Sequence, residues 1–443
     1  MPGGAVAQLG ERLVRNEEVR GSNPLGSTTL PGPMNENDIS VPSLRGHRPF
    51  VLFWFARIFS SLALQMQVVA VGWQVYELTA SPLDLGFVGL AQFIPAFALV
   101  LVAGHAADRY RRGPIVRLAQ TIEGMAAAGL ALGTAQGWLT RDLILAFVFV
   151  LGAARAFEAP TLQALLPGLV PLPVLPRAVA GSASANQVAT IAGPALGGIG
   201  YALSPTFVYA ACCALLVAAS ILISLIRVER VAPKRERVTV SIFFAGISFI
   251  RRNPVVLGAI SLDMFAVLLG GATALLPIYA RDIFHTGPWG LGLLRAAPAA
   301  GALLMALVLT RWPLRRRVGQ KMFAAVAIFG AATVVFAFSQ SLALSLAALA
   351  TLGAADMVSI VVRQTLVQLQ TPDAMRGRVN AVNSLFIGTS NQLGEFESGV
   401  TAALFGTVPS VVIGGGGTLL VVAIWMKAFP ALLRVDRLAS RSG

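Results

Sequence analysis

The chain has 443 residues, of which 56% are hydrophobic and only 12% are charged. A water-soluble fold of this length could not bury so much apolar surface, so the composition excludes an ordinary soluble protein and indicates a membrane protein. The formal net charge of +14 would point to a nucleic-acid partner in a soluble protein, but here the basic residues fill short breaks between apolar runs, so no nucleic-acid partner is expected.

Residues 1–33 show neither the charged-then-apolar pattern of a signal peptide nor helical periodicity. The run Gly21–Pro24 resembles what the conserved arm of a transfer-RNA gene would encode if it were read as protein. We therefore expect translation to begin at Met34, with residues 1–33 a misassigned extension. An ordinary disordered tail is the alternative.

About twelve apolar stretches follow, each long enough to cross the roughly 30 Å of bilayer hydrocarbon as a helix. We expect the spanning helices at residues 50–76, 84–107, 114–137, 142–166, 177–203, 206–227, 254–280, 288–311, 319–338, 342–368, 378–405 and 409–430. Turn residues separate them, as in Thr79–Pro82 and His285–Pro288. The sequence thus predicts an all-α polytopic membrane protein.

The longest polar interval divides the spans into two sets of six. The expected parts are an N-terminal bundle at 34–227, a linker at 228–253, a C-terminal bundle at 254–430 and a tail at 431–443. Within the linker, Val240–Ile250 has one apolar side and precedes Arg251 and Arg252. This pattern predicts an amphipathic helix on the inner leaflet.

Lysine and arginine are concentrated in alternate loops. One set of loops holds 19 of them and the other set holds only Arg141 and Arg281. Basic residues near the ends of spanning helices are retained in the cytoplasm. We therefore expect a multi-pass protein of a bacterial inner membrane with both termini in the cytoplasm.

The two halves also resemble each other in sequence. When the first half is shifted along the second half, residues at loop positions match. One shift aligns Pro82 with Pro288, Arg109 with Arg315 and Gly113 with Gly319. A slightly different shift aligns Gln163 with Gln364, Pro171 with Pro372 and Arg177 with Arg378. Two six-helix repeats in parallel arrangement are typical of transporters, whose substrate site lies between the repeats near the middle of the membrane. A receptor or a membrane enzyme would not require such a repeat.

The loop after the second expected helix reads GHAADRYRRG and is similar to the signature loop of the major facilitator superfamily. This resemblance covers Leu44–Leu438 and implies two pseudo-symmetric six-helix bundles. It also implies that Gly104 lets helices approach and that Asp108, Arg109 and Arg112 belong to a conformational latch. A loop whose arginines only set the topology is the alternative. The loop departs from the family at Arg111, and Leu314 replaces the aspartate in the second half.

The fifth expected helix carries IAGPALGG, which is similar to the motif associated with antiporters of this superfamily. The matching residues are Gly193, Pro194, Gly197 and Gly198, and ordinary packing of small residues is the alternative interpretation. The segments FARIFSSLALQMQVVAVGWQVYELT and TSNQLGEFESG resemble the branch that includes enterobactin exporters and macrolide efflux proteins. Both resemblances favour export over import.

Carboxylates inside spanning helices cost roughly 2.5–3.5 kcal/mol on insertion scales, so each needs a partner, a wet cavity or a role. Asp263, Glu158 and Asp356 are the candidates for proton coupling. Asp263 has no opposite charge within four positions and is the first choice. Glu158 follows Arg155 by three residues, so a structural ion pair is an equal alternative for it.

Polar residues at helical spacing form stripes on the first, fifth and eleventh spans, which we expect to face a central cavity. The cavity candidates are Arg57, Gln65, Arg155, Asn186, Asn383, Asn391 and Glu397. Hydrogen bonding between helices is the alternative role. The sequence has no phosphate loop, nucleophile elbow or metal-ligand pair, so no cofactor, metal site or enzymatic activity is expected.

The sequence therefore predicts a secondary active transporter that exports amphipathic small molecules of drug or siderophore type in exchange for protons. Its expected partners are the small-molecule substrate, protons and the lipid bilayer. Import or facilitated passage of a small metabolite is one alternative. A non-transporting membrane scaffold or sensor is another.

Overall fold

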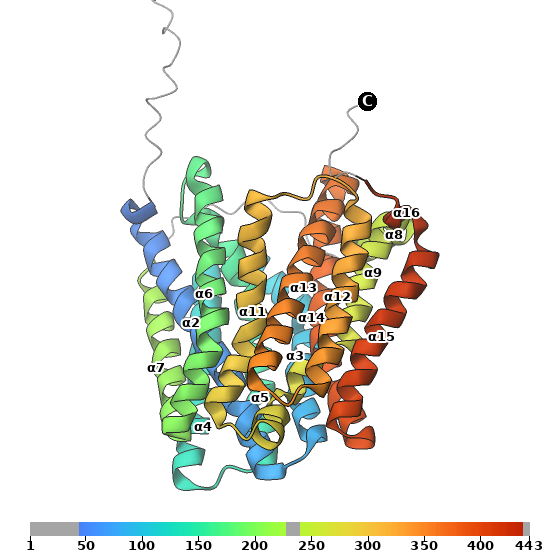
Figure 1. Cartoon of the computed structure of the whole chain (residues 1–443). Coiled ribbons are helices and arrows are strands. Elements are labelled where there is room, and N and C mark those ends of the chain that lie inside the picture. The colour runs from blue at the N-terminus through green and yellow to red at the C-terminus, as the bar shows by residue number, and fades with distance from the viewer. Residues whose placement is uncertain (1–43, 227–239, 437–443) are drawn as a thin grey trace, which may run out of the picture. The chain divides into compact units, whose positions relative to one another are not determined.

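A computed structural model describes residues 44–226 and 240–436 of the chain (Figure 1). These residues are almost entirely helical, and no strand occurs among them. The expected all-α fold is confirmed. The proposed extension at 1–33 and residues 228–239 of the expected linker lie outside the described residues.

The N-terminal half has six long helices. They are α2 (Arg48–Thr79), α3 (Pro82–Arg109), α4 (Arg112–Gln136), α5 (Arg141–Leu165), α6 (Leu175–Leu203) and α7 (Pro205–Ser224). Short 3-10 turns at Leu44–Gly46, Leu166–Gly168 and Leu172–Val174 flank them. Several of these helices begin with proline in the first turn, as α3 does at Pro82. A serine or threonine caps the N-terminus of others, such as Ser81 before α3 and Thr140 before α5.

The C-terminal half begins with α8 (Val240–Arg252). Its other elements are the seventh span, built from α9 (Pro254–Leu269), η5 (Ala272–Leu275), α10 (Leu276–Ile278) and η6 (Tyr279–Ile283), then α11 (Pro288–Arg311), α12 (Val318–Phe338), α13 (Leu342–Gln370), α14 (Asp373–Phe405), α15 (Thr407–Ala428) and α16 (Pro430–Leu433). The seventh span is interrupted at Gly271, where an added Cβ would lie 2.4 Å from the Gly394 carbonyl oxygen of α14. Only glycine allows the two backbones to approach so closely.

Ten helical segments of the described residues are long and apolar enough to cross a membrane. Of the twelve expected spans, α6 and α14 are not among these ten segments. With 29 and 33 residues they are long enough to cross the membrane, but they are less apolar than the others. These two helices carry the polar stripes noted in the sequence. Both helices contact the opposite half, α6 through α11 and α14 through α3.

Packing partners repeat between the halves. In the first half α3 packs on α5, α4 on α7 and α2 on α6; in the second half α11 packs on α13, α12 on α15 and α9 on α14. The same pairing of corresponding helices confirms two pseudo-symmetric bundles.

The two halves contact each other through α3 with α14 and through α6 with α11. An added Cβ at Gly86 of α3 would lie 3.1 Å from the Gly399 Cα of α14. An added Cβ at Gly198 of α6 would lie 2.4 Å from the Pro288 carbonyl oxygen of α11. These contacts lie at the end of the bundle that carries the α2–α3 and α6–α7 connections, which we call the closed end. Toward the opposite end, an added Cβ at Gly104 or Gly388 would have nothing within 4 Å.

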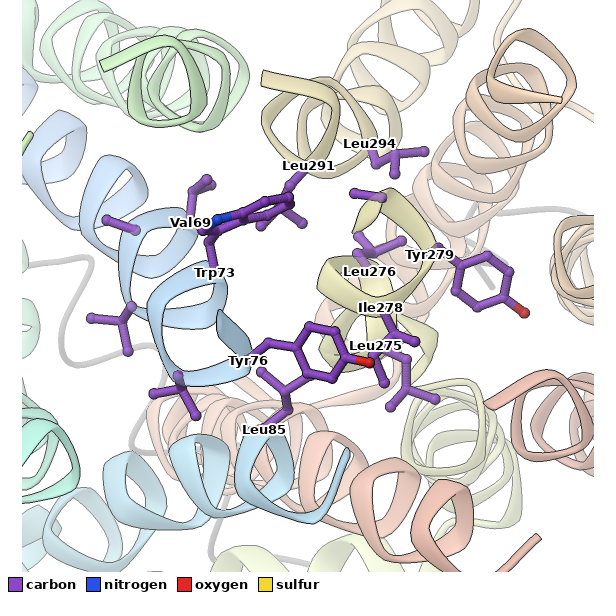
Figure 2. Packing of buried hydrophobic residues seen from close by; sticks show 14 of the residues in the cluster. Val69, Trp73, Tyr76, Leu85, Leu275, Leu276, Ile278, Tyr279, Leu291 and Leu294 are labelled. Atoms are coloured by element: carbon purple, nitrogen blue, oxygen red, sulfur yellow. The ribbon is translucent and has the colours of Figure 1, made fainter. Parts of the chain in front are cut away.

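Apolar side chains fill the interface near the closed end. Figure 2 shows Trp73 and Tyr76 of α2 facing Leu276 of the seventh span and Leu291 and Leu294 of α11. All of these side chains are at least nine-tenths buried. The layer that they form therefore joins the two halves and excludes water there.

The expected amphipathic helix is present as α8, and part of its apolar face packs on α14; its position on the inner leaflet stays a prediction. Gly246 and Ile250 are buried, and Ile250 packs in a cluster with Val379 and Val382 of α14. An added Cβ at Gly246 would lie 2.9 Å from the Arg378 carbonyl oxygen. The helix thus covers the start of α14.

Candidate functional site

Glu158 of α5 lies at a junction of three helices in the N-terminal half. It is 2% exposed, and its Oε1 accepts hydrogen bonds from Ser60 of α2 and, at 2.9 Å, from Gln120 of α4. Arg155 approaches its Oε2 with NH1 at 3.3 Å. The ion pair proposed from the spacing of Arg155 and Glu158 is therefore present, with two further hydrogen-bond donors.

A second buried carboxylate, Glu123 of α4, faces the same junction. It is 3% exposed, its Oε1 has no hydrogen-bond partner among the described residues, and it interacts electrostatically with Glu158 and Arg155. The sequence analysis missed it. The available signal was a glutamate about ten residues into an otherwise apolar span, the same signal that singled out Asp263.

Arg57 of α2 completes this group. It is partly buried, interacts electrostatically with Glu158 and Arg155, and its Nε has no hydrogen-bond partner among the described residues. We call Arg57, Glu123, Arg155 and Glu158 the N-terminal charge cluster. Sequence analysis had placed Arg57 in a cavity stripe, and the fold brings it beside the carboxylates of two other helices.

The C-terminal half has a corresponding group around Asp263 of α9. Asp263 Oδ2 lies 3.2 Å from NH2 of Arg363 on α13, and Ser359 donates to its Oδ1 at 3.4 Å. Arg363 also donates to Oδ1 of Asn383 on α14 at 3.0 Å. Asp263 has no opposite charge within four positions along the chain, and the packing of α9 on α13 supplies one from a distant part of the sequence.

Asp356 lies about two turns before Arg363 on α13. It interacts electrostatically with Asp263 and with Arg363, and it lines a small cavity together with Asp263 and Ser359. Two carboxylates and one guanidinium thus share this part of the second half. We call Asp263, Asp356 and Arg363 the C-terminal charge cluster.

The residues of the signature loop occupy the end of α3 and the start of α4. Arg112 donates from Nε to the Ala107 carbonyl at 3.3 Å and from NH1 to the Ala164 carbonyl at 2.7 Å, so it ties this loop to the end of α5. Arg109 is exposed, and no helix approaches Gly104 in this conformation. The Asp108 side chain lies outside the described part of the chain, so its role in a latch stays a prediction.

The glycines of the α6 motif lie where other helices come close. An added Cβ at Gly193 would lie 2.5 Å from the Gln65 Cβ of α2, and one at Gly197 would lie 2.7 Å from the Met66 Cα of the same helix. Gly198 instead faces α11 of the other half, and the Pro194 carbonyl oxygen lies against Gly292 of α11. The motif therefore contacts both a neighbour within its bundle and the opposite bundle.

The remaining cavity candidates do not form one group. Gln65 donates to Thr190 at 3.4 Å, and Asn186 accepts from Ser61 at 3.2 Å, so these residues join α2 to α6. Asn383 accepts the hydrogen bond from Arg363 described above. On α14, the two candidates form hydrogen bonds within their own helix. Asn391 donates to the Ile387 carbonyl oxygen, and Glu397 accepts from the Thr401 hydroxyl.

One further charged pair was not expected from the sequence. Arg295 of α11 and Glu395 of α14 interact electrostatically, and Arg295 Nε has no hydrogen-bond partner among the described residues. Glu395 lies against Gly89 of α3, where an added Cβ would be 3.0 Å from its Oε2. The pair therefore lies close to the contact between the two halves.

A polar contact also joins the halves at the closed end. The Tyr76 hydroxyl of α2 donates to the Asp282 carboxylate, and NH1 of Arg281 donates to the Tyr76 carbonyl at 3.2 Å. The Arg281 guanidinium lies 5.6 Å from the centre of the Tyr76 ring. These contacts tie the first span to the seventh.

The family model described as transmembrane secretion effector matches residues 43–442. Enterobactin exporter EntS of Citrobacter koseri is 27% identical over 414 residues, which cover 89% of this chain and 95% of the relative. EntS of Escherichia coli O1:K1 is 26% identical over 416 residues, with the same coverage.

Solved structures show the same fold. A mutant of the nucleoside transporter NupG superposes with a TM-score of 0.69 at 12% identity, covering 86% of this chain and 100% of that one. A bacterial homologue of the iron transporter ferroportin in its inward-facing state superposes with a TM-score of 0.65 at 17% identity, covering 89% and 100%. A bacterial homologue of the lysosomal transporter Spinster, inward-facing and unoccupied, gives 0.66 at 14% identity, covering 88% and 97%.

Proposed function

Because the chain belongs to the transmembrane secretion effector family of major facilitator transporters, we propose that it exports amphipathic small molecules of drug or siderophore type by alternating access in exchange for protons. The membrane is the inner membrane of a bacterial cell, and both termini lie in the cytoplasm. No step of this cycle is enzymatic.

One observation carries the proposal. The two six-helix halves contact each other through glycine-lined helix pairs at the closed end, whereas Gly104 and Gly388 face open space toward the other end. Two halves whose glycine-lined contacts gather toward one end are suited to rocking about a site between them. The loops at the closed end are poor in basic residues, so this conformation opens toward the cytoplasm under the positive-inside rule.

Relatives support the direction of transport. The curated relatives that match nearly the whole chain are named as exporters of enterobactin, and the family description refers to secretion. The α6 motif, with Gly193 and Gly197 packed against α2 and Gly198 against α11, is the feature of the chain that resembles antiporters. Export is therefore the direction that we propose.

The buried charges support proton coupling. Each half holds a carboxylate paired with a guanidinium, Glu158 with Arg155 and Asp263 with Arg363, and a second carboxylate near each pair. Binding a proton to one of these carboxylates changes the charge of its cluster and so the strength of the ion pair. A cluster that lies between packed helices can convert that change into a different helix arrangement.

The test is transport by purified protein in proteoliposomes of known orientation. Radiolabelled catecholate siderophores and macrolides serve as substrates, with and without an imposed pH gradient. We expect accumulation against a substrate gradient that depends on the pH gradient and disappears with a protonophore. Equilibration without dependence on pH would indicate a facilitator, and accumulation only in the opposite direction would indicate an importer.

A further inference from the structure

A group of exposed basic side chains lies where α11 ends and α12 begins. We call it the basic patch, and its members are Arg311, Arg315, Arg316, Arg317, Lys321 and Arg434. The helix α11 starts at the closed end with Pro288 and has 24 residues, so its last turn lies about 36 Å away. The basic patch is therefore at the end of the bundle opposite the closed end.

The C-terminal segment brings Arg434 to the other members from a distant part of the sequence. The backbone N–H of Gly319 donates to the Val435 carbonyl oxygen at 3.0 Å, and that of Arg317 donates to Oδ1 of Asp436 at 3.0 Å. Arg434 directly precedes these acceptors, so it is held beside the first turn of α12. Figure 1 shows α16, which leads into this segment, at the same end as the α11–α12 connection.

The basic patch has little opposite charge of its own. Within the described ranges, none of its six side chains has a hydrogen bond or an ion pair, and the carboxylate that contacts its backbone is Asp436. Other basic side chains at this end do have partners. Arg112 donates to two backbone carbonyls, and Arg376 lies 2.7 Å from Asp373. Six positive charges in the patch thus stand against one negative charge.

Trp312 indicates the depth of the patch in the membrane. It directly follows the last residue of α11 and is 70% exposed. Tryptophan is enriched at the boundary between hydrocarbon and headgroups, because its ring is apolar and its N–H is polar. Arg311 precedes Trp312 and the other arginines of this connection follow it closely. Their charged groups therefore lie at the level of the lipid headgroups.

Membrane topology explains only part of this arrangement. Basic residues near helix ends are retained in the cytoplasm, which accounts for their presence at this end. Topology does not require that two distant segments join into one patch, where like charges repel one another. Groups of about four to eight lysines and arginines beside a spanning helix are typical of surfaces that bind anionic lipids.

We propose that the basic patch binds the headgroup of an anionic phospholipid in the cytoplasmic leaflet. The phosphate group accepts hydrogen bonds from the exposed guanidinium groups, whose planar forks match its oxygens, and Trp312 lies beside the acyl chains. Because Arg434 comes from the C-terminal segment, one lipid bridges that segment and the start of α12. This assigns a lipid partner to the C-terminal half and goes beyond the proposed transport of a substrate.

The test is native mass spectrometry of the purified full-length protein in a neutral detergent, titrated with dioleoyl phosphatidylglycerol or dioleoyl phosphatidylethanolamine. The two lipids share their acyl chains and a phosphate, but only phosphatidylglycerol has a net negative charge. We expect phosphatidylglycerol to bind on the order of tenfold more tightly. The triple variant Arg315→Gln, Arg316→Gln, Arg434→Gln should lose on the order of tenfold in affinity for it.

The matched control is the triple variant Arg111→Gln, Arg117→Gln, Arg177→Gln, which removes the same charge from exposed positions of the first half. It should keep most of its affinity for phosphatidylglycerol. Thermal unfolding without lipid shows that both variants are folded, as expected for substitutions of exposed side chains. Unchanged affinity in the patch variant, an equal loss in the control, or equal binding of the two lipids by the wild type would overturn the proposal.

A second measurement separates a lipid headgroup from a soluble phosphate. Inorganic phosphate alone, at the concentration of lipid phosphate, should leave the unfolding temperature of the wild type unchanged, because it lacks the acyl chains that keep a headgroup at this surface. Stabilisation by inorganic phosphate equal to that by phosphatidylglycerol would assign the patch to a soluble anion and contradict the proposal. Neither measurement uses a substrate or a gradient, so both are independent of the proposed export.

Discussion

Asp263 of α9 and Arg363 of α13 form an ion pair of 3.2 Å although a hundred residues separate them, and their side chains are 6% and 3% exposed. Arg363 also donates to Asn383 of α14, so one guanidinium joins three helices of the second half. This arrangement places a carboxylate proposed for proton coupling inside the network that holds its bundle together.

Replacing Asp263 should therefore affect both stability and coupling. Asp263→Asn removes the direct ion-pair partner of Arg363, and breaking a buried pair costs about 3–5 kcal/mol. We expect a lower unfolding temperature in detergent and loss of transport driven by a pH gradient. The double variant Asp263→Asn, Arg363→Gln should regain much of the stability without regaining coupling. Gradient-driven transport by the stable double variant would remove Asp263 from the coupling mechanism.

The two carboxylates of the N-terminal charge cluster should differ in their response to amide substitution. Glu158→Gln removes the acceptor of Arg155, so we expect a loss of about 1–3 kcal/mol of stability. Glu123→Gln removes a carboxylate whose Oε1 has no hydrogen-bond donor among the described residues, so it should change stability by no more than about 1 kcal/mol. Thermal unfolding of both variants at one pH provides the comparison. Equal destabilisation by the two substitutions would show that the hydrogen bonds of Glu158 do not distinguish it from Glu123.

The closed end should be sensitive to small additions at the glycine contacts. An added Cβ at Gly198 would lie 2.4 Å from the Pro288 carbonyl oxygen, so Gly198→Ala should strain this interface by about 1 kcal/mol or more. We expect about fivefold faster labelling of a buried reporter, Leu294→Cys, by a membrane-impermeant maleimide.

The labelling experiment uses a background in which Cys212 and Cys213 are replaced by alanine, since both are free thiols. Gly104→Ala is the control for Gly198→Ala, because an added Cβ at Gly104 meets open space. Faster labelling in Gly104→Ala, or no change in Gly198→Ala, would show that the glycine contact does not hold the end closed.

The hydrogen bond from Tyr76 to Asp282 should also favour the closed end. Tyr76→Phe keeps the ring in the apolar layer and removes the hydroxyl, so labelling of Leu294→Cys should rise about two- to tenfold, equivalent to roughly 0.5–1.5 kcal/mol. Tyr279→Phe is a matched control, because the Tyr279 hydroxyl donates to the Ala337 carbonyl within the same half. If both substitutions raised labelling equally, the Tyr76 contact would have no specific role in closure.

Sequence alone determined the class of fold and the positions of the helices along the chain. The thickness of the hydrocarbon layer requires about twenty apolar residues for each span, so the positions of the helices can be read along the chain. Matches such as Arg109 with Arg315 indicated the repeat, and the signature loop indicated the family. These features are local in sequence, and each can be recognised without knowing which helices touch.

Tertiary structure decided which charges meet. Arg363 reaches Asp263 because α9 packs on α13, and Glu123 reaches Glu158 because α4 packs on α5. Whether two side chains on different helices face each other depends on the rotation of each helix and on the side chains packed between them, which spacing along one helix does not specify. For the same reason, only the structure identified which end of the bundle is closed, because closure depends on backbone contacts between helices of opposite halves.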